Sequence, residues 1–119
     1  MIDYWHNPRC SKSRGGLTLL QEQGQDVSVR LYLTDAPDLA QITAVWRALG
    51  SPPAIDMMRK GDSLFKELGL DATASDDALI RAMAAHPALI ERPIAIRGDK
   101  AVIGRPTERL QELVVAKPA

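Results

Sequence analysis

The sequence of 119 residues has little of what defines several classes of protein. It contains one cysteine, Cys10, which excludes an internal disulfide and with it the disulfide scaffold of small secreted domains. The two histidines, His6 and His86, lie far apart, and with a single thiol they do not supply a four-ligand zinc pattern. We therefore expect no bound metal, and no pattern in the sequence indicates a bound organic cofactor.

Neither sign of charge is in excess, and no long apolar run is present. Lys plus Arg and Asp plus Glu each number 15, so the formal net charge is zero and we expect no broad basic surface for nucleic acid or an anionic membrane. No apolar run approaches the roughly 18 residues that cross a bilayer, and the polar stretch 1–14 has no signal-peptide core. We expect a monomer in the reducing cytoplasm, where a lone thiol stays a thiol.

What is present is typical of one globular domain spanning residues 1–119. Apolar residues make up 45% of the chain and charged residues 25%. The predicted elements are strands at 2–6, 27–33, 94–97 and 100–103, helices at 11–23 and from Pro106, and a helical block at about 36–90. This order is β-α-β, a helical insertion, then β-β-α, and it predicts an α/β fold with one sheet. In the second strand Val27, Val29, Leu31 and Leu33 share one face, and the tail 116–119 is expected to fray.

The segment His6–Arg14 is the sharpest local feature, because it places Cys10 where a strand passes into a helix. Free backbone N–H groups at a helix start lower the pKa of a thiol and form an anion site. Further positive potential comes from basic neighbours, namely Arg9, Lys12, Arg14 and His6. A thiolate beside an anion site predicts a nucleophile that attacks an oxyanion or a disulfide. The alternative is a cysteine that acts only as a small buried apolar side chain.

The spacing Cys10-x-x-Ser13 resembles a dithiol motif with a hydroxyl in place of the second sulfur. Without a resolving thiol, an adduct on Cys10 must be released by a thiol from outside the chain. Ser13 either donates a hydrogen bond to the thiolate or caps the helix, and His6 either orients this loop or caps the strand. A tyrosine-phosphatase loop is excluded, because its Cys-x₅-Arg spacing does not fit Cys10 and Arg14.

Four segments of the chain together form a recognisable pattern. They are His6-Asn7-Pro8-x-Cys10-x-x-Ser13-Arg14, Met58-Arg59-Lys60, Glu91-Arg92-Pro93-Ile94 and Gly104-Arg105-Pro106-Thr107-Glu108. In order and distance they resemble the glutaredoxin-coupled arsenate reductase (ArsC) family of the thioredoxin-like superfamily, over essentially the whole chain apart from a shorter C-terminal tail. Thioredoxin-like folds have a cis proline at the place of Pro93, and the sequence leaves open whether the Arg92–Pro93 bond is cis.

The resemblance implies a thioredoxin-like fold with a mixed sheet and an oxidoreductase of arsenic detoxification. Cys10 would form a covalent thiol–arsenate adduct, and Arg59, Arg92 and Arg105 would bind the oxyanion, with His6, Ser13 and Arg14 in support. Glutathione would be the co-substrate that attacks the adduct, and glutaredoxin would then remove the glutathione and leave arsenite. Arginine suits such a site because its planar fork pairs two oxygens and stays charged.

Two other functions remain open at this stage. Related thioredoxin-like proteins are thiol-stress regulators that bind a protein partner such as RNA polymerase, but they use a Cys-x-x-Cys switch whose second position here is Ser13. The same scaffold could also reduce another oxyanion or a glutathione-linked substrate, because tetrahedral oxyanions present similar charge and shape. Each of the three arginines, taken singly, is also typical of a solvated surface position.

Overall fold

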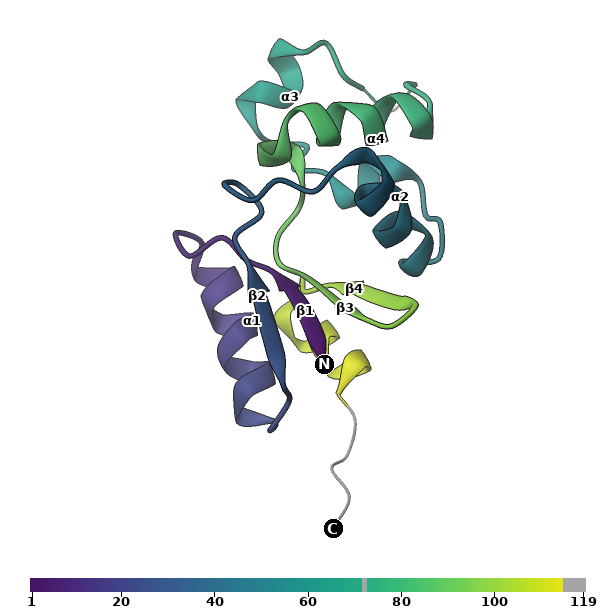
Figure 1. Ribbon diagram of the computed structural model, residues 1–119. Helices are drawn as coiled ribbons and strands as arrows, with labels where there is room; N and C mark the ends of the chain where they lie inside the picture. The colour runs from purple at the N-terminus through teal and green to yellow at the C-terminus, as the bar shows by residue number, and fades with distance from the viewer. Residues whose placement is uncertain (72, 115–119) are drawn as a thin grey trace.

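A four-stranded mixed sheet organises the computed structural model, which describes residues 1–71 and 73–114 (Figure 1). The strand order is β2-β1-β3-β4. β1 (Ile2–Trp5) lies parallel to β2 (Val27–Arg30) and antiparallel to β3 (Ile94–Arg97), which pairs with β4 (Lys100–Ile103) across the tight turn at Gly98. The predicted α/β fold with a mixed sheet is confirmed, and the last two strands have the bounds predicted from the sequence.

Alternate residues of β1 enter two separate apolar cores. Tyr4 packs beneath α1 (Ser11–Glu22) and the 3-10 helix η3 (Thr107–Leu113), together with Leu20 and Leu110. Trp5 faces the other side, towards the helical segment between β2 and β3. Because successive side chains of a strand point to opposite faces, one short strand joins both cores.

The helical segment gathers beyond one end of the sheet (Figure 1). It comprises α2 (Leu39–Ala48), η1 (Ala54–Met57), α3 (Ser63–Glu67), α4 (Asp76–Ala85) and η2 (Pro87–Leu89). Asp38 begins α2 with a capping box, in which its carboxylate accepts from the Gln41 N–H at 2.8 Å and the Gln41 side chain accepts from the Asp38 N–H at 3.0 Å. Ser75 caps α4 by accepting from the Ala78 N–H.

The predicted strand at 27–33 is too long. β2 ends at Arg30, and the chain turns at once, with the N–H groups of Thr34 and Asp35 both bonded to the Leu31 carbonyl. Val29, Leu31 and Leu33 are 45%, 45% and 44% exposed, so the apolar alternation here does not mark a buried face. β2 is an edge strand, and no element covers these three side chains among the described residues.

The predicted helix from Pro106 forms as a 3-10 helix that begins at Thr107. Leu110 and Leu113 are three residues apart, which places both on the same side of a helix with three residues per turn, against the sheet. The Arg92–Pro93 and Arg105–Pro106 bonds are both cis. The tail expected to fray lies outside the described residues.

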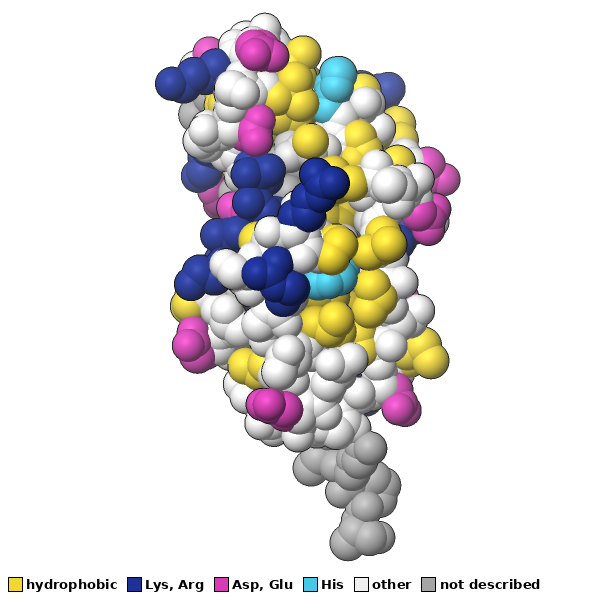
Figure 2. Space-filling model, turned by 90° about the vertical axis from the view of Figure 1, so that its left-hand side faces the viewer, with side chains coloured by type: hydrophobic (Ala, Val, Ile, Leu, Met, Phe, Trp, Pro, Cys, Tyr) yellow, Lys and Arg dark blue, Asp and Glu magenta, His cyan; other side chains and the backbone are white. Residues whose placement is uncertain are grey.

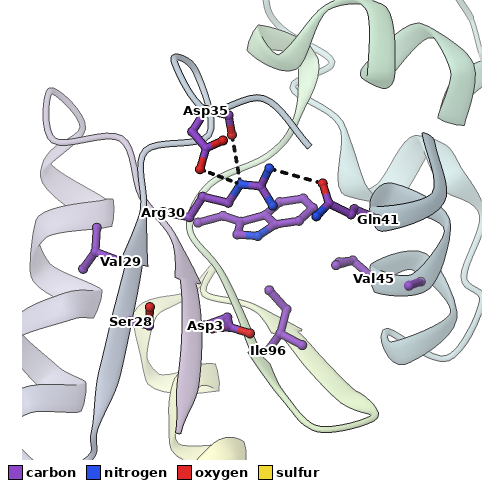
Figure 3. Close-up of a pocket in the computed structure, with 10 residues that line it drawn as sticks. Asp3, Ser28, Val29, Arg30, Asp35, Gln41, Val45 and Ile96 are labelled. Atoms are coloured by element: carbon purple, nitrogen blue, oxygen red, sulfur yellow. Dashed lines mark hydrogen bonds and ion pairs between the residues drawn. The ribbon is translucent and has the colours of Figure 1, made fainter. Parts of the chain in front are cut away.

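Arg30 ties the end of β2 to the start of α2 (Figure 3). Its Nε donates to the Asp35 carbonyl at 2.9 Å, and Nη2 donates to Gln41 Oε1 at 3.2 Å. Arg30, Asp35 and Gln41 are among the residues that line a hollow of about 410 Å³ between the sheet and α2. The guanidinium of Arg30 is therefore already bonded to protein partners in this hollow. In the described part of the chain, no helix has the length and apolar character needed to cross a membrane.

Candidate active site

Cys10 occupies the position immediately before the first turn of α1. Its backbone is extended (φ −96°, ψ 121°), and its carbonyl accepts the first helical hydrogen bond from the Arg14 N–H at 3.0 Å. The thiol is half-buried. A side chain in this position lies beside the unsatisfied N–H groups of the first helical turn, as the sequence predicted.

The local environment favours the thiolate form of Cys10. Burial raises the pKa of the thiol, but hydrogen bonds from the backbone N–H groups of Ser13 and Lys12 and from the Arg92 guanidinium lower it. The charge of Arg92 adds to this, and the net pKa lies below the ordinary thiol value. Cys10 is therefore enriched in the nucleophilic form near neutral pH.

The Ser13 side chain holds the segment between β1 and α1 in place. It is fully buried, with Oγ 2.7 Å from His6 Nδ1 and accepting from the Asn7 N–H at 3.0 Å. The Ser13 carbonyl accepts from the Tyr4 hydroxyl at 2.6 Å. The hydroxyl is thus used for the loop, and it is the backbone N–H of Ser13 that helps to lower the pKa of the Cys10 thiol.

His6 and Arg14 also act on the loop. His6 is 7% exposed, and burial followed by the charge of Arg14 lowers its pKa, so the ring is neutral near neutral pH. Arg14 Nη1 donates to the Pro8 carbonyl at 2.7 Å. Both side chains hold the segment between β1 and α1 in shape, and no hydrogen bond from either to the Cys10 sulfur occurs among the described residues.

The three arginines named from the sequence converge on one hollow of about 260 Å³. It is lined by Arg59, Lys60, Gly61, Asp62, Glu91, Arg92 and Arg105. Arg105 reaches Cys10, with Nη2 3.6 Å from Sγ, while its Nε donates to the Arg92 carbonyl at 2.7 Å. The structure therefore joins the thiol and the guanidinium groups in one place.

Backbone pairing explains how Arg59 arrives beside the other two. The Arg59 N–H donates to the Leu89 carbonyl at 2.8 Å, and the Glu91 N–H donates to the Met57 carbonyl at 2.8 Å. An isolated antiparallel bridge between Met58 and Ile90 lies between these bonds. The part of the helical segment that holds α3, α4 and η2 is thereby closed into a loop, and both of its ends border the hollow.

Two carboxylates in this hollow had no role in the sequence-based prediction. Glu91 Oε1 lies 3.2 Å from Arg105 Nε and 3.6 Å from Arg92 Nη1, and Asp62 Oδ2 lies 3.3 Å from Arg59 Nη1. Glu91 directly precedes Arg92 in the third matched segment, so the sequence indicated that it lies near the site but did not predict which arginines it contacts. These carboxylates orient the guanidinium groups and offset part of their charge.

Arg92 retains unused hydrogen-bonding capacity. Its Nε is buried and has no partner, unlike nearly all buried polar atoms in folded proteins. Its side chain is 15% exposed, so most of the guanidinium is shielded from water. An oxyanion that enters the hollow meets preformed donors in a partly desolvated setting, where charge–charge attraction is stronger than in water.

Tyr32 is a buried neighbour of the site that the sequence did not single out. Burial raises its pKa to about 12, and the nearby charges of Arg92 and Arg59 only partly oppose this. The phenol therefore stays neutral and adds no charge to the site. Its place in the turn after β2 gave no signal in the sequence.

A second hollow, of about 220 Å³, borders the same loop. It is lined by His6, Asn7, Pro8, Arg9, Leu31, Leu33 and Thr34. It shares no lining residue with the arginine hollow. The segment just before Cys10 thus borders a hollow whose walls include Leu31 and Leu33, and Cys10 itself contacts Arg105 of the arginine hollow.

The arrangement provides a nucleophilic sulfur, a cluster of oxyanion donors and no second thiol in the chain. Within residues 1–71 and 73–114, no cluster of three or more His, Cys, Asp or Glu side chains could hold a metal ion. Such a site is suited to covalent attack by sulfur on the central atom of a tetrahedral oxyanion, with the arginines stabilising the charge on the oxygens.

Comparison with known proteins agrees with this geometry. A family model described as "ArsC family" matches residues 5–113. Over 114 residues, "Arsenate reductase" of Neisseria meningitidis serogroup A is 49% identical, covering 95% of this chain and 97% of that protein. "Uncharacterized protein YfgD" of Escherichia coli is 46% identical, with 95% and 96% covered.

A solved structure extends the similarity to three dimensions. "Arsenate reductase from Vibrio cholerae" superposes with a TM-score of 0.89 at 43% identity, covering 96% of this chain and 97% of that one. The predicted thioredoxin-like fold is confirmed by this match together with the strand order of the sheet.

Proposed function

This chain belongs to the ArsC family, and on that premise we propose that it reduces arsenate to arsenite with Cys10 as the nucleophile. The single observation that carries the proposal is the 3.6 Å approach to the Cys10 sulfur of Nη2 of Arg105, a residue that also lines the arginine hollow. Similar proteins named arsenate reductase support the choice of arsenate as the oxyanion.

Arsenate enters the hollow with its oxygens paired to Arg59, Arg92 and Arg105. The Cys10 thiolate attacks arsenic, an S–As bond forms, and one arsenic-bound oxygen leaves as water after protonation. Negative charge builds up on the remaining oxygens in the transition state, where fixed guanidinium groups stabilise it most. Arsenic is still in oxidation state V after this step.

Thiols from outside the chain complete the reaction. The thiol of glutathione displaces a second oxygen as water and gives a Cys10–S–As–S–glutathione species. The thiolate of glutaredoxin then attacks the glutathione sulfur, the As–S bond to glutathione breaks, and its electron pair stays on arsenic, which becomes As(III). The two outer sulfurs form a disulfide, and water hydrolyses the Cys10–As bond to release arsenite. The cytoplasm supplies both thiols, and the protein acts as a monomer in this scheme.

A coupled assay tests the proposal. Arsenate-dependent oxidation of NADPH is followed with glutathione, glutathione reductase and glutaredoxin present, for the wild type and Cys10→Ser. We expect turnover that needs every thiol component and is lost in Cys10→Ser, with circular dichroism unchanged. Full activity of Cys10→Ser would remove Cys10 from the mechanism. No turnover by a folded wild type whose Cys10 reacts with iodoacetamide would assign the site to another substrate.

The arginine hollow is also compatible with a second class of substrate, namely other oxyanions. Guanidinium groups recognise charge and shape, and arsenate and phosphate are nearly alike in both. Phosphate is expected to bind as a weak competitor, since a thiol does not readily reduce phosphorus. Replacing arsenate with other oxyanions or with a glutathione-linked compound in the same assay identifies the preferred substrate. No observation favours a regulatory switch, because the Ser13 hydroxyl is buried and bonded within the loop.

A further inference from the structure

The apolar hollow beside Cys10 has no part in oxyanion binding. Its walls come from the segment before Cys10 and from the turn after β2, where Leu31 and Leu33 lie. Val29 lies in the edge strand β2, two residues before Leu31, and all three side chains are close to half exposed. We call Pro8, Val29, Leu31 and Leu33 the apolar patch.

The apolar patch contributes little to the folded core. Its three aliphatic residues belong to neither of the two apolar cores as buried members. Large aliphatic side chains left exposed together on an edge strand are a liability for a protein that stays alone in solution, and such patches mark sites of contact with other molecules. Because Leu31 and Leu33 line a hollow with the segment just before Cys10, a molecule bound there would lie close to the thiol.

Charge surrounds the patch on the side of Cys10. Arg9, Lys12 and Arg14 are exposed and lie within four residues of Cys10 in the sequence. Figure 2 shows Lys and Arg side chains gathered across the middle of this face, with apolar side chains directly beside them. A complementary surface has an apolar centre and an acidic rim.

The lone thiol determines which molecule must approach this surface. Because the chain has one cysteine, a thiol from outside must reach the Cys10 adduct to end each cycle. Glutathione is small enough to approach without covering the surroundings of Cys10. A protein thiol can reach a half-buried sulfur only by contact with the surface around it, and the arginine hollow on one side is filled by the oxyanion.

We propose that the apolar patch, with its basic rim, is the docking surface for a protein thiol reductant that has an apolar centre and an acidic rim. This rests on the proposed function, because it assigns a place to the final thiol partner of that reaction. The partner's thiolate attacks the sulfur of the glutathione that is bound to arsenic on Cys10. A disulfide between the partner and glutathione forms, the As–S bond to glutathione breaks, and its electron pair stays on arsenic, which becomes As(III).

The test measures docking apart from arsenate chemistry. Cys10 is first converted to its mixed disulfide with glutathione by glutathione disulfide. Glutaredoxin then attacks the glutathione sulfur, becomes glutathionylated and frees the Cys10 thiolate, so the rate of release is a second-order constant for the protein partner. Dithiothreitol releases the same thiol without a docking surface and serves as the small-molecule reference.

We compare the wild type with the double variant Leu31→Ser/Leu33→Ser. Leu68→Ser is the matched control, because Leu68 is 40% exposed and lines neither of the hollows beside Cys10. Loss of two central contacts should lower the glutaredoxin rate about tenfold or more. The dithiothreitol rate should be unchanged in both variants. The glutaredoxin rate of the wild type should also fall as ionic strength rises, because the basic rim is screened.

Several outcomes would overturn the proposal. An unchanged glutaredoxin rate in the double variant would place the docking surface elsewhere, and so would an equal loss in Leu68→Ser. A dimer in solution that the double variant dissociates would assign the patch to a second copy of this chain. If the double variant does not fold, Arg9→Glu in the wild-type background should still lower the glutaredoxin rate and weaken its salt dependence. Absence of arsenate turnover would refute the proposed function and leave this rate measurement valid.

Discussion

Replacement of Glu91 by Gln should tighten the binding of a tetrahedral anion. The Glu91 carboxylate lies between two of the arginines, with Oε1 3.2 Å from Arg105 Nε and 3.6 Å from Arg92 Nη1, and its side chain is 22% exposed. It therefore occupies part of the positive field that an anion would use. The variant keeps the shape of the side chain and removes one negative charge.

Two opposing effects set the size of the change. A unit charge about 6 Å from a bound anion costs about 0.7 to 2.8 kcal/mol for effective dielectric constants of roughly 80 to 20, which is about 3- to 100-fold in affinity. Against this, the arginines lose one orienting partner, and a partly exposed ion pair contributes about 0 to 1 kcal/mol. Arg105 keeps its bond to the Arg92 carbonyl at 2.7 Å, so its position survives. The removal of repulsion should dominate.

Protection of Cys10 from iodoacetamide by phosphate measures this affinity without turnover. For groups near a protein surface the effective dielectric constant is about 20, so the net gain is about 1.8 to 2.8 kcal/mol. The dissociation constant for phosphate in Glu91→Gln should therefore be about 20- to 100-fold lower than in the wild type. Glu112→Gln is the matched control, because Glu112 pairs with Arg109 at 3.2 Å on the exposed surface and the net charge changes equally. Equal or weaker phosphate binding in Glu91→Gln would refute the reasoning, as would the same gain in the control.

Four further predictions concern the thiol and its supports. Arg92→Lys should lower kcat for arsenate about 100-fold, because one ammonium does not reproduce the guanidinium fork; an unchanged kcat in the coupled assay would place Arg92 outside the reacting pocket. The pH midpoint of Cys10 alkylation should lie below the ordinary thiol value and rise in Arg92→Met, since Arg92 lowers this pKa. Because folding lowers this pKa, ionised Cys10 stabilises the folded state above the ordinary thiol value, and this contribution is lost as the pH falls through the lowered value; urea unfolding of the wild type and Cys10→Ala across that window measures it. Ser13→Ala should lower the free energy of unfolding by about 1 to 3 kcal/mol, since it leaves buried partners at His6 and Asn7 unsatisfied, whereas the exposed Ser11→Ala should change little in the same urea titration.

Local signals in the sequence were sufficient for the elements whose patterns are short-range. β3 and β4 flank the turn at Gly98-Asp99, which predicted a hairpin, and both strands have the predicted bounds. The prediction that Cys10 starts a helix also rested on neighbouring residues, and the lowered pKa of the thiol follows from that position. Such features depend on backbone geometry within a few residues.

Where a local pattern depends on what covers it, the prediction failed. The alternation of Val29, Leu31 and Leu33 is that of a buried strand face, but β2 is an edge strand and ends at Arg30. These side chains are exposed because no described element covers them, and the sequence of one segment contains no information about which other segments pack against it. The same side chains are the basis of the docking surface that we propose.

The sequence by itself determined the α/β element order and placed the single thiol of the chain at a helix start, and it predicted a nucleophile that depends on thiols from outside the chain. Only the tertiary structure decided which side chains surround that thiol. Arg59, Arg92 and Arg105 line one hollow. Arg59 reaches the other two because the backbone at Met57 and Arg59 pairs with the backbone at Leu89 and Glu91, at the two ends of the stretch that holds α3, α4 and η2. The direction of each guanidinium is then set by Glu91 and Asp62. Contacts between residues distant in the chain depend on packing of the whole molecule, and local propensity carries no information about them.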